Sequence, residues 1–127
     1  MKNEFIPYEQ ALALKKLGFD ESCLGYYDIE GLKVSYDRYL NSENKNSLFP
    51  HPSITNNPKI SVPLYQQAFR WFREKCGLNH FVELDVDCEP SYYNAYVQCS
   101  LVYHGDNYEV AELACLKKLI ELSTKTA

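Results

Sequence analysis

The sequence predicts an α+β fold, an antiparallel sheet built from two hairpins with about three helices packed mainly on one face. Two segments, residues 23–40 and 81–103, contain apolar and polar residues in the alternation that is typical of strands. Three further segments, residues 7–19, 63–78 and 106–122, place apolar residues at helical spacing. In chain order the predicted elements are therefore α-β-β-α-β-β-α.

Length and composition predict a single domain spanning residues 1–127, because a chain of this size can bury a self-sufficient core. The net charge of −4 argues against sequence-independent binding of nucleic acid and against docking on an anionic membrane. No apolar run is long enough to span a bilayer, and the first residues, MKNEFIPYEQ, do not look like a secretory signal. We therefore expect a cytoplasmic protein.

The first predicted helix, residues 7–19, begins at Pro7, which suits a first helical turn. It ends with Gly18 as a left-handed cap and Phe19 folding back behind it. A hairpin follows, with strands CLGYYD and LKVSYDRYL joined by turn residues between Asp28 and Gly31. Residues 41–61 then lose this periodicity and predict a long irregular loop.

The segment PLYQQAFRWFREKCGL, residues 63–78, mixes aromatic and basic residues, as nucleic-acid surfaces can do. At about 100° per residue, however, the apolar side chains fall on one arc and the arginines on the other side. This segregation predicts an amphipathic core helix, with Trp71 buried, Cys76 on the apolar arc and Gly77 as its cap.

The clearest alternation lies in FVELDVDC and YNAYVQCSLVY, which we predict as two strands of one hairpin. The expected buried face includes Cys99 and Leu101. The expected solvent face carries mostly polar residues: Glu83, Asp85, Asp87, Asn94, Tyr96, Gln98 and Ser100. In the last helix, residues 106–122, Asp106 and Glu109 have the spacing of a capping box.

Searches for chemical motifs find no catalytic or metal-binding pattern. The three histidines have no ligand spacing, and no phosphate-binding loop or nucleophile elbow is present, so we predict a non-enzymatic protein without a cofactor. The five cysteines form no C-x-x-C pair and sit on apolar stripes, which is typical of structural thiols in a reducing compartment: Cys23, Cys76, Cys88, Cys99 and Cys115.

Three blocks, PYEQALALKKLGFDES, PLYQQAFRWFREKCGL and YEVAELACLKKLIEL, carry a resemblance that covers most of the chain outside residues 41–61. Together they resemble a family of small uncharacterised proteins encoded by phages, prophages and mobile elements of gut anaerobic bacteria. The resemblance implies a genetic context and no activity or site residue.

These observations favour a protein-interaction domain whose partner is a host or phage protein, or a second copy of the chain. The candidate partner surface is Tyr-bearing and acidic, because Tyr suits interfaces and carboxylates select a basic partner: Tyr92, Tyr96, Glu83, Asp85 and Asp87. A solvated strand face is the plainer interpretation of these acidic residues. The alternative functions are nucleic-acid binding through basic residues and an enzyme of unrecognised type; the basic residues are Lys15, Lys16, Arg70, Arg73 and Lys75.

Overall fold

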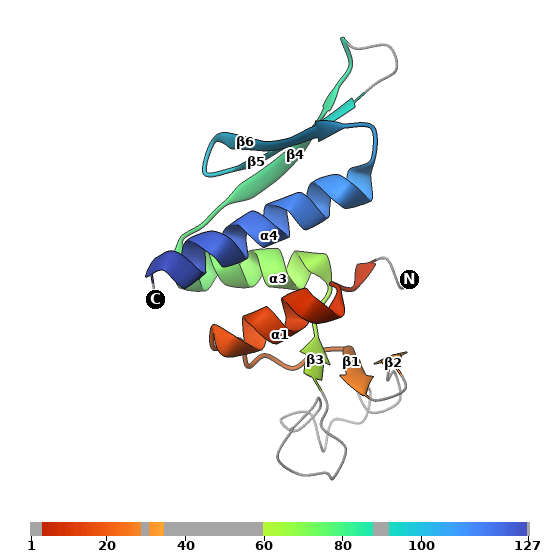
Figure 1. Cartoon of the computed structure of the whole chain (residues 1–127), viewed down its shortest axis with the longest axis vertical. Helices are drawn as coiled ribbons and strands as arrows, with labels where there is room; N and C mark the ends of the chain where they lie inside the picture. The colour runs from red at the N-terminus through yellow and green to blue at the C-terminus, as the bar shows by residue number, and fades with distance from the viewer. Residues whose placement is uncertain (1–3, 29–30, 35–59, 88–91, 127) are drawn as a thin grey trace. The chain divides into compact units, whose positions relative to one another are not determined.

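The computed structural model describes residues 4–28, 31–34, 60–87 and 92–126 (Figure 1). Its contacts divide the chain into two compact units, Met1–Gln66 and Gln67–Ala127. The predicted α+β class is confirmed. In place of the one expected sheet, the described strands form two antiparallel sheets of three strands each, and helices pack on both.

The first unit contains helix α1 (Tyr8–Lys16) and strands β1 (Gly25–Asp28), β2 (Gly31–Val34) and β3 (Ile60–Val62). β1 and β2 form the predicted hairpin, although residues 35–40 of its expected second strand lie outside the described residues. β3 was not predicted. It pairs with the other side of β1 and includes the last two residues of the expected loop at 41–61; the rest of that loop lies outside the described residues.

The predicted glycine caps are both present. Gly18 adopts a left-handed φ of 102°, and the N–H of Phe19 donates to the carbonyl of Leu14 at 3.0 Å. Gly77 has a φ of 68°, and the next residue, Leu78, donates its N–H to the carbonyl of Phe72 at 3.1 Å. Each glycine ends a helix by turning the chain back over its last carbonyls.

The predicted middle helix changes type along its length. α3 (Tyr65–Trp71) is α-helical, and the following segment η3 (Phe72–Cys76) is a π-helix. Trp71 is buried, as predicted, whereas Cys76 is exposed, so its place on the apolar arc was wrong. A π-helix winds more loosely than 100° per residue, and this carries Cys76 away from the apolar side.

The second unit contains strands β4 (His80–Asp85), β5 (Tyr92–Val97) and β6 (Ser100–Gly105), in the order β4-β5-β6, and helix α4 (Tyr108–Thr126). The single long strand predicted over residues 93–103 is therefore wrong. A two-residue turn at Gln98 and Cys99 divides it into β5 and β6.

Both turn residues adopt left-handed conformations, with φ of 52° at Gln98 and 69° at Cys99. Such tight hairpin turns usually contain Asn and Gly, so Gln98 and Cys99 give no turn signal in the sequence. Two hydrogen bonds with Asn79 hold Gln98 in place. The backbone N–H of Gln98 donates to the Asn79 carbonyl at 3.0 Å, and the Asn79 N–H donates to Gln98 Oε1 at 2.8 Å.

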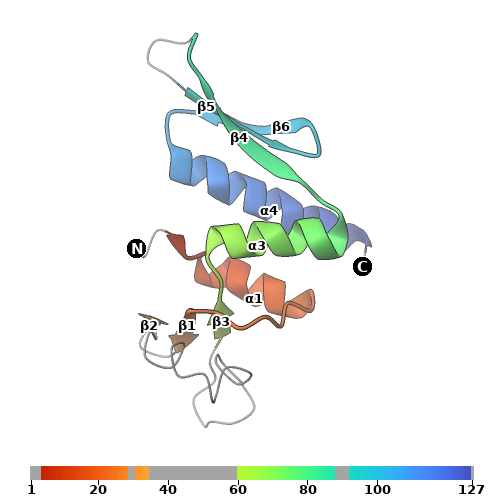
Figure 2. The same cartoon turned by 180° about the vertical axis from the view of Figure 1, so that it is seen from behind.

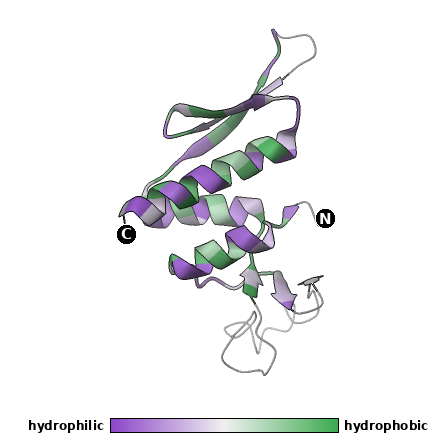
Figure 3. Ribbon diagram, viewed as in Figure 1, coloured by the Kyte–Doolittle hydropathy of each residue, from purple (hydrophilic) through white to green (hydrophobic). Residues whose placement is uncertain are grey.

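α4 lies along one face of the β4-β5-β6 sheet (Figures 1 and 2). Polar and apolar bands alternate along this helix (Figure 3), and its apolar side is buried at Ala111, Cys115, Leu116 and Leu119. The helix cap differs from the predicted capping box. Asn107, rather than Asp106, accepts a hydrogen bond from the N–H of Val110 at 3.0 Å, because α4 begins at Tyr108.

Candidate protein-interaction face

The β4-β5-β6 sheet has an inner face, against α4, and an outer face, which no described helix of the second unit covers (Figures 1 and 2). Ala95 and Val97 are almost fully buried, so the odd-numbered residues of β5 point inward. Paired residues of neighbouring strands share a face. The register therefore assigns eight residues to the outer face: Phe81, Glu83, Asp85, Tyr92, Asn94, Tyr96, Leu101 and His104.

Leu101 reaches the outer face because of the turn, and a β-bulge follows it in β6. The turn pairs Val97 with Ser100 and Tyr96 with Leu101, which reverses the alternation expected for an uninterrupted strand. The bulge opposite Ala95 and Tyr96 then adds one residue to β6 and restores the original alternation, so that Ala95 pairs with Tyr103. Leu101 was predicted to be buried; it is 56% exposed.

The end of the outer face next to this turn is apolar and aromatic. The rings of Phe81 and Tyr96 stack with their centroids 4.6 Å apart and an interplanar angle of 18°. Phe81 is nevertheless 49% exposed, and Leu101 lies opposite Tyr96 on the neighbouring strand. Three adjacent strands thus present one large apolar side chain each to the solvent, which is the kind of surface that marks an interaction site.

The other end of the outer face is polar and internally hydrogen-bonded. Asn94 links its two neighbours, because its Nδ2 donates to Asp85 Oδ2 at 3.5 Å and its Oδ1 contacts His104 Nδ1. The ring of His104 also meets the edge of Tyr92, with centroids 4.9 Å apart and an angle of 88°. These contacts hold the side chains in defined positions and so reduce the entropy that a partner's binding would cost.

Glu83 lies between the two ends and accepts a hydrogen bond from the Tyr96 hydroxyl at 3.1 Å. Partial burial, this hydrogen bond and the negative charges of Glu83 and Asp85 all raise the pKa of Tyr96, so the hydroxyl remains a donor at neutral pH. None of the three strands contains Lys or Arg. The outer face is therefore acidic beside an aromatic cluster.

Four of the five predicted surface residues, Tyr92, Tyr96, Glu83 and Asp85, share the outer face. The fifth, Asp87, follows β4 in an exposed turn, where its N–H donates to Asp85 Oδ1 at 3.2 Å.

Two residues expected on the solvent face lie elsewhere. Gln98 belongs to the turn, and Ser100 pairs with Val97 on the inner face, because the turn interrupts the expected strand.

Three outer-face residues were not predicted: Phe81, Leu101 and His104. Phe81 could have been found, because it shares the odd numbering of Glu83 and Asp85 along β4. His104 could have been found as well, because it shares the even numbering of Asn94 and Tyr96 and the bulge restores that alternation. Leu101 could not, since its side depends on the turn. The presence of Leu101 in the aromatic cluster is thus a result of tertiary structure.

The cysteines divide into two classes. Cys23 and Cys115 are buried, and burial raises their pKa to about 12 and about 11, which fits the predicted structural thiols. Cys76 and Cys99 are exposed, so their predicted places on apolar stripes were wrong; Cys99 lies in the turn. Cys88 lies outside the described residues.

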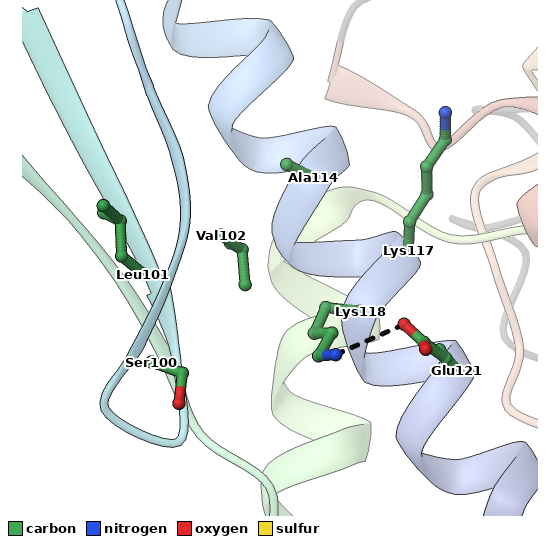
Figure 4. Close-up of a pocket in the computed structure, with 7 residues that line it drawn as sticks. All are labelled: Ser100, Leu101, Val102, Ala114, Lys117, Lys118 and Glu121. Atoms are coloured by element: carbon green, nitrogen blue, oxygen red, sulfur yellow. Dashed lines mark ion pairs between the residues drawn. The ribbon is translucent and has the colours of Figure 1, made fainter.

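A hollow of about 510 Å³ lies between β6 and α4 (Figure 4). The view shows Leu101 on the far side of β6 from the helix, in agreement with the register. Lys118 and Glu121 form an ion pair of 3.4 Å across one turn of α4, whereas Lys117 points away from this pair. The charged groups that line this hollow all come from α4.

Comparison of the chain with protein-family models, with curated proteins and with solved structures finds no match. Within the described ranges, no helix combines the length and hydropathy needed to cross a membrane. The same part of the chain contains no group of three or more His, Cys, Asp or Glu side chains arranged to hold a metal ion.

Proposed function

We propose that this chain is a non-enzymatic, cytoplasmic protein-interaction domain of phage or mobile-element origin, and that it binds its partner through the outer face. The observation that carries the proposal is a cluster on three adjacent strands, in which exposed Phe81 and Leu101 flank half-buried Tyr96. The resemblance of the three sequence blocks supports the origin, and the free cysteines, which are typical of a reducing compartment, support the location.

The cluster has the composition of an interface centre. Aromatic residues are enriched at the energetically important positions of interfaces, where they supply area at low entropic cost. Phe81 and Tyr96 are already stacked, so binding does not have to order them separately. An apolar side chain of the partner would cover the exposed parts of both rings and of Leu101.

The charges beside the cluster indicate the partner's chemistry. Glu83 and Asp85 share the face with the cluster, and the three strands contain no Lys or Arg. Carboxylates repel phosphate, so this face does not suit the alternative function of nucleic-acid binding. A protein surface that presents Lys or Arg around an apolar residue would complement it.

Replacing the two exposed apolar residues of the cluster by serine tests the proposal. The double variant Phe81→Ser and Leu101→Ser removes most of the exposed apolar area and leaves the inner face intact. Partners recovered from producing cells by affinity capture of the wild-type chain should be identified by mass spectrometry and purified. Their binding to the double variant should weaken by about 100-fold, which corresponds to about 2.7 kcal/mol.

The matched control is Val110→Ser, because Val110 is also exposed, at 44%, and lies outside the outer face. It should bind the purified partner like the wild type. Equal weakening in the control and in the double variant, or no weakening in either, would contradict the proposal. Circular dichroism of the wild type, the double variant and the control shows whether each chain is folded.

A further inference from the structure

The two edges of the β4-β5-β6 sheet differ in their ability to accept another strand. β6 contains the β-bulge, which breaks the regular spacing of its backbone groups. β4 pairs with β5 through six consecutive residue pairs without a register shift. A regular edge strand is a template for pairing with another chain, whereas a bulged one discourages it. The edge open to addition is therefore β4.

The hydrogen bonds at the start of β4 show which of its backbone groups face outward. The Asn79 carbonyl accepts from Gln98, so Asn79 directs its groups toward the β5 side. Backbone groups alternate in direction along a strand, and Phe81, Glu83 and Asp85 therefore face β5 as well. His80, Val82 and Leu84 direct their N–H and carbonyl groups away from the sheet, where the described residues provide no neighbouring strand.

The side chains of β4 specify what an added strand must carry. On the outer face are the carboxylates of Glu83 and Asp85. On the inner face Leu84 is 51% exposed, and Val86, in the turn that follows β4, is 71% exposed. An added strand that alternates basic and apolar residues would place its basic residues beside the carboxylates and an apolar residue beside Leu84.

We infer that β4 accepts an extended segment of the partner as a fourth strand, and that this segment alternates Lys or Arg with apolar residues. The inference rests on the proposed function and names its binding mode and partner class. A second copy of the chain fits less well, because pairing β4 with β4 would place the carboxylates of both copies on one face. Main-chain hydrogen bonds would supply affinity, and the alternation would supply specificity.

The direct probe is a fluorescently labelled peptide of about eight residues that alternates Val and Lys, a length typical of strands. Fluorescence anisotropy should show that it binds the full chain at least about tenfold more tightly than the matching Val/Glu peptide. A third peptide keeps the Val/Lys sequence but carries N-methyl groups on alternate backbone nitrogens of its pairing edge. It should lose at least about tenfold in affinity, because it cannot donate those hydrogen bonds.

Charge reversal supplies the complementary test. The double variant Glu83→Lys and Asp85→Lys should lose binding to the Val/Lys peptide and gain binding to the Val/Glu peptide. The control, Asp106→Lys with Glu109→Lys, changes charge equally at exposed positions outside these strands and should keep the original preference. If the charge-reversed chain is unfolded by circular dichroism, the single variant Glu83→Lys replaces it and should show a smaller shift in the same direction.

Two outcomes would overturn the inference and leave the proposed function standing. In one, the N-methylated peptide binds as well as its parent, which would mean that the face attracts Lys without strand addition. In the other, no peptide binds while a partner purified by capture still depends on Phe81 and Leu101. The proposed function itself would be contradicted if the captured partner bound the wild type and the double variant Phe81→Ser and Leu101→Ser equally well.

Discussion

The two faces of the β4-β5-β6 sheet both carry apolar side chains and differ in how far these are exposed. On the inner face Ala95 and Val97 lie against α4 and are at most 1% exposed. On the outer face Phe81 and Leu101 are about half exposed, although they are larger and more apolar than many buried residues. The comparison teaches that apolar content alone does not identify the core. The single amphipathic helix that follows the sheet decides which face is buried.

The largest expected effect comes from Leu116→Ala, which tests whether the inner face is the stability core. Leu116 is fully buried, and its truncation should reduce the free energy of unfolding by about 2 to 5 kcal/mol. That loss is a large part of a typical total of about 5 to 15 kcal/mol. Urea unfolding followed by Trp71 fluorescence would measure it. A loss below about 1 kcal/mol would show that α4 does not close this face.

The second prediction compares Cys115, which is buried on α4, with Cys99, which lies in the turn between β5 and β6. Burial, together with the charge of Glu112, raises the pKa of Cys115 from 9.0 to about 11. Cys99 is exposed. At pH 8 iodoacetamide should alkylate Cys99 at least about a hundredfold faster, because Cys115 reacts only when the structure opens. Peptide mapping by mass spectrometry would give both rates, and similar rates would contradict a closed inner face.

The same pKa shift predicts a pH dependence with a definite sign. The folded-state pKa of Cys115 lies above the ordinary value, so folding favours the protonated thiol. The associated stability is complete below about pH 9 and is lost as the pH rises through about 11. The variant Cys115→Ala should therefore lose less stability over this range than the wild type, as urea unfolding at each pH would show.

The smallest expected effect concerns the outer face. Glu83→Gln keeps the shape of the side chain and removes its charge, so the pKa of Tyr96 should fall back toward its ordinary value of 10.0. The contribution from partial burial should remain. NMR titration of the Tyr96 ring would follow the change, with the wild-type chain as the reference. An unchanged Tyr96 titration would show that the hydroxyl does not depend on Glu83 in solution.

Local patterns in the sequence were sufficient to predict several elements. Gly18 and Gly77 end their helices as predicted, because left-handed caps depend on a few adjacent residues. The burial of Trp71 followed from helical spacing, although the π-helix after it displaced Cys76. Strand β3 was missed because three residues are too few to show an alternation, and it is stabilised by pairing with β1, far away in the sequence.

The sequence by itself determined the α+β class, the alternation of β4 and the acidic residues Glu83 and Asp85 on one side of it. Those features depend on neighbours along the chain, whose period of two repeats without interruption. Only the tertiary structure decided that Gln98 and Cys99 form a turn and that a bulge follows it. These two changes of register depend on contacts with Asn79 and on pairing between strands, and the turn brought Leu101 beside Tyr96 on the outer face.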